Sequence, residues 1–362
     1  MADINQVRDA LAKILLPSGK SLIDADMLRA LSSEAGVVRF VIEAPSAEVA
    51  AQLGPFKEAA EAAVKQVAGV TSVSAVLTAH SGATPASKPP TSNAPPSLKI
   101  GQHPKPQSGP AKITGVDRIL AVASGKGGVG KSTVSANLAV ALARQGRSVG
   151  LLDADIYGPS QPRMMGASGR PASPDGKTII PLKAHGVTIM SLGLMLGEDK
   201  AVVWRGPMLM GALQQMLTQT EWGELDVLIV DLPPGTGDVQ LTLCQRSHVT
   251  GALVVSTPQD VALLDARRAI DMFNTLKTPI LGLIENMSQF ICPSCGHESH
   301  IFGHGGVALE AQKLGVPFLA ELPLALDVRT GGDSGQPIAL TDSASALPYA
   351  KLAERLILGG MA

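Results

Sequence analysis

The residues best suited to chemistry form a glycine-rich segment that contains two lysines, G-K-G-G-V-G-K-S at residues 125–132. This segment fits the phosphate-loop pattern G-x-x-x-x-G-K-[ST]. Its glycines let successive backbone N–H groups point at one anion, and a helix that starts at the loop adds the positive end of its dipole. We expect Lys131 at the β- and γ-phosphates and Ser132 at a magnesium ion. The predicted nucleotide-binding residues here are Gly125, Lys126, Gly127, Gly128, Val129, Gly130, Lys131, Ser132 and Thr133.

Carboxylates follow two apolar segments elsewhere in the chain. Asp153 and Asp155 come after the first segment, and Asp231 ends the second. Beside a phosphate site, carboxylates repel the ligand unless a divalent cation lies between them, so we expect at least one of Asp153 and Asp155 to face magnesium or its waters. Asp231, held at the end of a predicted strand, is expected beside the same ion. Asp153 alternatively caps the next turn. The loop after Asp231 contains Gly235, predicted to contact the γ-phosphate through its backbone, and Asp238, predicted to cap a helix.

A cysteine pair forms the second chemical motif, with Cys292 and Cys295 separated by two residues. Structural zinc sites and [4Fe-4S] clusters both take four protein ligands, and this pair supplies two. Three readings stay open: two chains pool their cysteines, a thiol-disulfide couple forms, or a histidine completes a zinc site. The candidate histidines are His297, His300 and His304. The third cysteine, Cys244, lies in a predicted helix and is expected to be a buried small hydrophobe.

Strand and helix patterns alternate from residue 113 to residue 362. Predicted strands are Ile119–Ala123, Ser148–Leu152, Val187–Ser191, Val227–Val230, Ala252–Ser256, Ile280–Ile284 and Phe318–Leu322. Predicted helices are Thr133–Gln145, Met208–Gln219, Val239–Arg246, Val261–Leu276, Val307–Leu314 and Ser345–Leu358. This alternation predicts an α/β fold with a mainly parallel, doubly wound sheet. Ligands of such a fold bind at the carboxyl ends of the strands.

Two further segments precede that domain. Residues 1–80 predict a small α+β domain from a helix containing Val7 and Leu11, a strand Val37–Ile42, a helix Ala47–Val67 and a strand Val70–Leu77. Residues 81–112 have eight prolines and no acidic residue, which predicts a linker.

The composition limits the classes of function. Of the 362 residues, 45% are apolar and 3% are aromatic, which suits an aliphatic core. A formal net charge of −1 argues against broad attraction to nucleic acid or anionic membrane. The apolar segments are shorter than a membrane span, and the first residues lack a signal-peptide pattern. We therefore expect a cytoplasmic protein without a disulfide framework.

Together these motifs resemble a known family. The early lysine in G-K-G-G-V-G-K-S is similar to the deviant phosphate loop of MinD, ParA and the nitrogenase iron protein. The ordered motifs D-A-D-I-Y-G-P-S, W-R-G-P-M, D-L-P-P-G-T-G-D, T-P-Q-D-V-A-L and C-P-S-C-G with I-F-G-H-G-G resemble those of the Mrp-type iron-sulfur carrier ATPases. Residues 1–80 resemble the small domain of the SufT and PaaD group, although they contain no cysteine.

The resemblance implies a P-loop ATPase that binds ATP and Mg²⁺ and works as a homodimer. It implies that Lys126 reaches the partner's nucleotide, that Asp155 orients the attacking water and that Asn286 binds adenine. It also implies a [4Fe-4S] cluster held by Cys292 and Cys295 of both chains. Slow ATP hydrolysis would then accompany cluster loading or transfer, with iron-sulfur scaffold proteins and recipient apoproteins as partners. We assign Lys126, Lys131 and Asp155 to catalysis and Ser132, Asp153 and Asp231 to magnesium.

Two other functions use the same loop. A positioning ATPase of the MinD or ParA kind assembles on membrane or DNA, which needs a basic amphipathic segment or a basic face. The C-terminal segment 352–358 is weakly charged and is expected to pack on the core. A P-loop NTPase with a structural zinc site is the other alternative.

Overall fold

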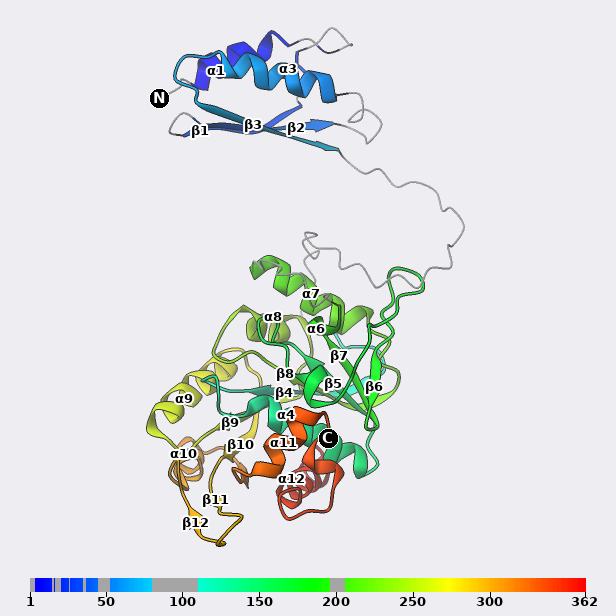
Figure 1. Cartoon of the computed structure of the whole chain (residues 1–362), viewed down its shortest axis with the longest axis vertical. Coiled ribbons are helices and arrows are strands. Elements are labelled where there is room, and N and C mark those ends of the chain that lie inside the picture. Colours follow the sequence, from blue (N-terminus) through cyan, green and yellow to red (C-terminus); the bar gives the residue numbers. More distant parts are fainter. Residues whose placement is uncertain are drawn as a thin grey trace. The chain divides into compact units, whose positions relative to one another are not determined.

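A computed structural model describes residues 4–14, 16, 21–25, 27–34, 37–44, 53–79, 110–195 and 206–362. The chain divides into two compact units, residues 1–88 and residues 89–362, which are described separately (Figure 1). Most of the predicted linker lies outside the described residues. At its end, the Ala111 N–H donates to the Arg246 carbonyl at 2.9 Å, so the large unit already includes Ala111.

The smaller unit is α+β, as the order of its elements predicted. Its described elements are α1 (Ile4–Ala12), β1 (Leu28–Glu34), β2 (Val37–Ala44), α3 (Gly54–Lys65) and β3 (Ser72–Ala79). The sheet order is β1-β2-β3, with β1 antiparallel and β3 parallel to β2. Both helices cover one face of this sheet (Figure 1), and Val7, Phe40 and Val64 lie in the core between them. Strand β1 was missed because its sequence, LRALSSE, has no β-branched or aromatic residue. Residues 47–52 of the predicted helix Ala47–Val67 lie outside the described residues.

The larger unit contains an eight-stranded sheet in the order β13-β10-β9-β4-β8-β5-β7-β6. The strands are β4 (Val116–Ala123), β5 (Val149–Asp153), β6 (Leu182–Ala184), β7 (Val187–Ser191), β8 (Leu225–Asp231), β9 (Gly251–Ser256), β10 (Ile280–Asn286) and β13 (Phe318–Leu322). All neighbours are parallel except β6 and β7. The predicted mainly parallel sheet is confirmed. The central strands are almost continuously apolar because both of their faces are buried.

Helices cover both faces of this sheet (Figure 1). They are α4 (Lys131–Arg144), α5 (Gln161–Met164), α6 (Leu192–Met195), α7 (Gly206–Gln219), α8 (Asp238–Arg246), α9 (Asp260–Thr275), α10 (Gly306–Leu314), α11 (Leu326–Ser334) and α12 (Leu347–Leu358), with a 3₁₀ turn at Ile338–Leu340. Successive residues of β4 enter opposite cores: Leu120 packs with residues of α4 and α12, and Ile119 with residues of α7 and α8. The sheet is therefore doubly wound, as predicted.

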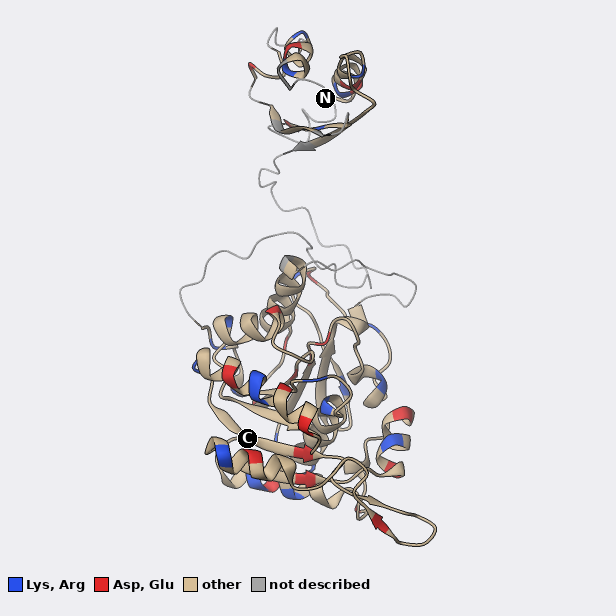
Figure 2. Ribbon diagram, turned by 90° about the vertical axis from the view of Figure 1, so that its left-hand side faces the viewer, with Lys and Arg blue, Asp and Glu red and all other residues tan. Residues whose placement is uncertain are grey.

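In the larger unit, the helices and strands that the sequence did not predict are short or poor in apolar residues. They are α5, α6, α11, β6 and the two strands of a small hairpin, β11 (Phe290–Ile291) and β12 (Glu298–Ser299). The C-terminal helix α12 buries Leu352 and Leu356, in agreement with the expected packing on the core. No described helix is long and apolar enough to cross a bilayer. Acidic and basic residues are interspersed along the helices visible in Figure 2.

Candidate functional site

The phosphate loop connects the end of β4 to the start of α4, as its sequence context predicted. Gly130 has a φ of 80°, in the left-handed region, and a Cβ there would collide with the side chain of Asn286. Gly125 lies so close to α9 that a Cβ would collide with the backbone of Asp265. These two positions require glycine because of backbone conformation or close approach. The loop is therefore held against both α9 and the end of β10.

Lys131 of the phosphate loop and Asp231 at the end of β8 are in direct contact. Lys131 Nζ lies 2.6 Å from Asp231 Oδ1, and both side chains are buried. Ser135 Oγ donates to the same carboxylate oxygen at 2.8 Å. A buried carboxylate needs such charge-assisted partners because an unpaired charge is costly away from water. The predicted phosphate lysine and the predicted magnesium aspartate thus lie in one polar cluster.

Gln161 completes this cluster, although the sequence analysis did not identify it. Its Nε2 donates to Asp231 Oδ2 at 2.9 Å and to the Ser132 carbonyl at 3.0 Å. The side chain is completely buried, and its Oε1 has no hydrogen-bond partner among the described residues. A glutamine directly after the motif D-A-D-I-Y-G-P-S was the available signal, since it follows two predicted magnesium-site carboxylates. Gln161 connects the phosphate loop to the acidic end of β8.

We expect the substitution Gln161→Leu to lower the free energy of unfolding by about 1–3 kcal/mol, because the buried Asp231 carboxylate and the Ser132 carbonyl each lose a donor. Urea denaturation measures this change. The matched control is Gln145→Leu, which removes an exposed bond to the Ala350 carbonyl and should change stability by less than about 0.5 kcal/mol. Equal effects of the two substitutions would show that the buried hydrogen bonds of Gln161 contribute no more to stability than the exposed one of Gln145.

Asp153 and Asp155 stand in different environments at the end of β5. Asp153 is buried and accepts four hydrogen bonds, from the N–H groups of Asp155, Ser160 and Gln161 at 3.0–3.2 Å and from Ser191 Oγ at 3.2 Å. Burial, with the nearby charge of Asp231, raises the pKa of Asp153 to about 7. These bonds match the alternative in which Asp153 organises the following turn.

Asp155 is half-buried and lines the cavity at the phosphate loop. One oxygen accepts from the Gly158 N–H at 3.2 Å. Burial raises its pKa. Of the two carboxylates, Asp155 is therefore the one that lines the cavity beside the phosphate loop.

Two cavities meet at the phosphate loop. One of about 240 Å³ is lined by the loop, Asp155 and Pro234. The second, of about 480 Å³, shares Gly130 and Thr133 with the first and extends to Asn286. Asn286 is buried, and its Nδ2 donates to the Val129 carbonyl at 2.8 Å, which leaves its Oδ1 as an acceptor for a ligand. This arrangement provides adjoining spaces for phosphates and for a nucleobase.

The loop after β8 lies beside the phosphate loop. The Gly235 N–H donates to the Ser124 carbonyl at 2.9 Å, so this group already has a partner in the structure. Gln240 Nε2 holds the carbonyls of Pro233 and Gly235 at 2.7 and 3.0 Å. The predicted cap at Asp238 is wrong: Gly237 is the N-cap, and Asp238 is the first helical residue, where its charge favours the helix dipole instead.

The early lysine of the loop, Lys126, is exposed. Its carbonyl accepts from Ser124 Oγ at 3.0 Å, which fixes the backbone while the side chain stays at the surface. Lys131, five residues later, is buried. The two lysines of the loop are thus placed differently, and Lys126 is accessible to a second molecule.

Cys292 and Cys295 lie in the turn between β11 and β12. The Cys292 N–H donates to the His297 carbonyl, and the Gly296 N–H donates to the Cys292 carbonyl, both at 2.9 Å. The backbone N–H groups of Cys295 and Ser294, and then the Cys295 thiol, lower the pKa of Cys292. A lowered pKa favours the thiolate, which is the form that binds metal. Cys295 is exposed and Cys292 half-buried, whereas Cys244 is buried in the core as predicted.

The histidines near this hairpin do not join the cysteines. His300 Nδ1 lies 2.9 Å from the Ser288 carbonyl, and His304 Nε2 lies 3.3 Å from Glu321 Oε2. In the part of the chain that the structure describes, no cysteine belongs to a group of three close metal-ligating side chains. Among the described residues, the histidines near the hairpin are thus held by partners other than the thiols.

Comparison with known proteins agrees with these features. A family model described as NUBPL iron-transfer P-loop NTPase matches residues 115–357, and one described as iron-sulfur cluster assembly protein matches residues 4–75. The iron-sulfur cluster carrier protein of Pseudomonas fragi is 53% identical over 255 residues, covering 68% of this chain and 89% of the relative. That of Escherichia coli K12 is 51% identical over 247 residues, covering 67% of each chain.

Solved structures agree as well. A nucleotide-binding protein in complex with ADP from Archaeoglobus fulgidus is 41% identical with a TM-score of 0.55, covering 61% of this chain and 87% of that one. The septum site-determining protein MinD from Pyrococcus horikoshii, with Mg-ADP, is 24% identical with a TM-score of 0.50, covering 68% of this chain and 98% of that one, which shows the shared fold alone. The resemblance stated from the motifs is confirmed: the chain belongs to the NUBPL iron-transfer P-loop NTPase family.

Proposed function

We propose that this protein is an ATP-dependent carrier that binds an iron-sulfur cluster and transfers it to recipient apoproteins. The observation that carries the proposal is the cysteine pair of the hairpin, with Cys295 exposed and Cys292 half-buried, which belongs to no group of three close metal-ligating side chains in the described part of the chain. Relatives at about half identity are named iron-sulfur cluster carrier proteins. Two chains that pool their cysteines supply the four thiolates that a [4Fe-4S] cluster takes.

In this proposal the nucleotide site binds ATP with magnesium. Lys131 and the loop amides hold the phosphates, while Ser132 and Asp231 hold the metal, with Asp153 shaping the turn that presents magnesium-bound water. Asp155 orients the attacking water from its position in the phosphate cavity. Asn286 offers its free Oδ1 to the amino group of adenine. Phosphoryl transfer depends mostly on such positioning and on charge stabilisation.

The dimer joins the two activities. Each chain lends its exposed Lys126 to the nucleotide of its partner, and the same interface brings the two hairpins together. If ATP and ADP favour different arrangements of the interface, and these arrangements bind the cluster with different affinities, exchanging the nucleotide changes the affinity for the cluster. This coupling distinguishes a carrier from a simple ATPase.

The proposal is tested by anaerobic reconstitution with iron and sulfide, followed by metal analysis and measurement of the mass in solution. We expect about four iron atoms and four sulfides per two chains, and a dimer that loses its brown colour when an apoprotein acceptor is added. One zinc per chain in a monomer would instead support a structural zinc site. A dimer without any metal would favour a positioning ATPase, whose fold this chain shares.

A further inference from the structure

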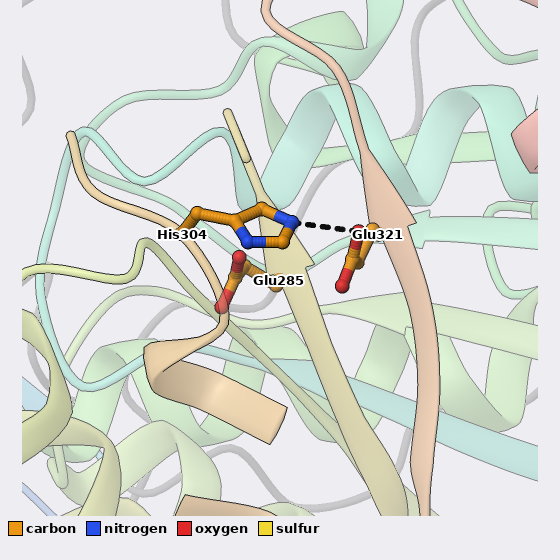
Figure 3. A group of neighbouring side chains, drawn as sticks. All are labelled: Glu285, His304 and Glu321. Atoms are coloured by element: carbon orange, nitrogen blue, oxygen red, sulfur yellow. Dashed lines mark hydrogen bonds and ion pairs between the residues drawn. The ribbon is translucent and has the colours of Figure 1, made fainter. Parts of the chain in front are cut away.

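The described residues contain one group of three side chains that can ligate a metal, formed by Glu285, His304 and Glu321 (Figure 3). Glu285 lies near the end of β10 and Glu321 in the neighbouring β13, and the two residues are paired in register. Paired residues on parallel strands point to the same face of the sheet, so the two carboxylates are neighbours. The sheet itself places two oxygen ligands side by side.

The histidine is brought to this pair by the start of α10. The N–H groups of Gly305 and Val307 donate to the two oxygens of Glu285, each at 2.9 Å. Gly305, with a φ of 74°, is the N-cap of the helix and follows His304 directly. Glu285 therefore fixes the start of α10, and this contact holds His304 beside the carboxylates. One potential ligand atom from each residue lies within 4.8 Å of the others.

The three side chains keep capacity for a further ligand. A carboxylate offers about four lone-pair positions, and the two amide donors occupy two of those on Glu285. Glu285 is completely buried, whereas the side chains of His304 and Glu321 are 45% and 39% exposed. The group is thus anchored on the protein side and open to solvent on the other. Water can fill the remaining coordination positions of a bound ion.

We propose that Glu285, His304 and Glu321 bind one divalent first-row transition-metal ion, at a site separate from the cysteine pair. One imidazole nitrogen with carboxylate oxygens suits Fe²⁺, Co²⁺ or Zn²⁺, whereas Mg²⁺ prefers oxygen alone and Cu⁺ prefers sulfur. A cation here also relieves the repulsion between the adjacent carboxylates. No thiol contributes to the group, so metal binding does not depend on the cluster.

The surroundings of the site suggest its use. Glu321 lines a cavity of about 610 Å³ that is also bordered by Ile291 and Pro293 of the cysteine hairpin. An ion at this site therefore lies beside a space that reaches the cysteine motif. Holding Fe²⁺ at a cavity that extends to the cysteine hairpin is the role that this position fits. That role rests on the proposed function, whereas the metal binding itself does not.

The test uses untagged full-length protein with both Cys292 and Cys295 replaced by serine, which removes competing thiolates. Saturating Mg²⁺ and ADP occupy the nucleotide site, and Co²⁺ is the probe, followed by calorimetry and visible absorption. We expect one Co²⁺ per chain. Adding His304→Ala or the isosteric Glu321→Gln should weaken binding by about tenfold or more, the loss typical of a disturbed metal site. The control is His297→Ala, which removes an exposed hairpin histidine outside the group and should leave the affinity unchanged.

Failure of the inference has a clear signature. If the serine variant binds no Co²⁺, or binds it equally tightly after both His304→Ala and Glu321→Gln, the site does not exist. Cluster assembly on His304→Ala protein with intact cysteines is measured in parallel. A His304→Ala protein that loses Co²⁺ but still assembles the cluster supports a separate ion site. If the protein with all its native cysteines assembles no cluster while the serine variant binds Co²⁺ in a His304-dependent way, the proposed function alone is overturned.

Discussion

Replacement of Cys292 or Cys295 by serine is expected to abolish cluster binding, from about four iron atoms per dimer to almost none after reconstitution. A serine hydroxyl stays protonated near neutral pH and is a harder ligand than a thiolate, so each dimer would lose two of four ligands at once. The measurement is iron and sulfide content together with visible absorbance under anaerobic conditions. ATP binding should remain, because the cysteine turn lies outside the cavities at the phosphate loop.

Cys244 gives the matched control for this experiment. It is the remaining cysteine of the chain, and it lies buried among the residues that α7 and α8 contribute to the core. Cys244→Ala should retain the full iron content, with only the small loss of stability expected for a shortened core side chain. If the serine variants kept their iron while Cys244→Ala lost it, the cluster would have to be assigned elsewhere.

The second large effect is expected at Lys126. The substitution Lys126→Gln should lower the rate of ATP hydrolysis by about 10³-fold or more, as for other cations supplied in trans to a transferring phosphoryl group. Nucleotide affinity should change little, because the buried Lys131 and the loop amides remain in the same chain. Single-turnover hydrolysis and nucleotide binding, measured on the same preparation, separate the two quantities. Lys177→Gln removes another exposed lysine and serves as the control.

A mixing experiment decides whether the lysine acts on its own chain or on the partner. Lys126→Gln protein is mixed with Asp155→Asn protein, after each has been found inactive alone. In a mixed dimer, the chain that lacks Lys126 keeps its own Asp155 and receives Lys126 from its partner, so one of the two sites is complete. Recovery of hydrolysis supports donation across the interface. Two variants that stay inactive in a mixture known to contain mixed dimers would place Lys126 at its own nucleotide.

Local patterns in the sequence predicted much of this molecule. The glycine loop, the acid at the end of β8 and the cysteine pair are contiguous motifs, and the strands are long aliphatic segments, so each is visible without knowledge of the fold. The missed features depend on contacts between distant segments. Gln161 meets Asp231 across 70 positions of the chain, and the unforeseen contact of Asn286, a residue expected at adenine, with the Val129 carbonyl spans 157. No periodicity or spacing encodes such contacts, because the sheet order creates them.

Glu285 shows the same limit. Its partners at the start of α10 lie 20 and 22 residues away, beyond the cysteine hairpin, and its neighbour Glu321 is on another strand. The position of His304 after the cysteine pair made it a candidate zinc ligand, whereas the structure places it beside two glutamates. The short helix α11 was missed for a different reason. Its segment, LDVRTGGDS, contains two glycines and has Val328 as its buried residue, which gives a weak helical pattern.

The end of β10 has a mechanical consequence. Two consecutive residues, Glu285 and Asn286, project to opposite sides of this strand. Glu285 accepts hydrogen bonds from the start of α10, and Asn286 donates one to the phosphate loop. The cysteine hairpin begins just after Asn286, at the end of β10, and the chain comes back to the same strand where the start of α10 contacts Glu285. A displacement of the phosphate loop can therefore reach the base of the hairpin through a single strand, because neighbouring residues of β10 hold both segments.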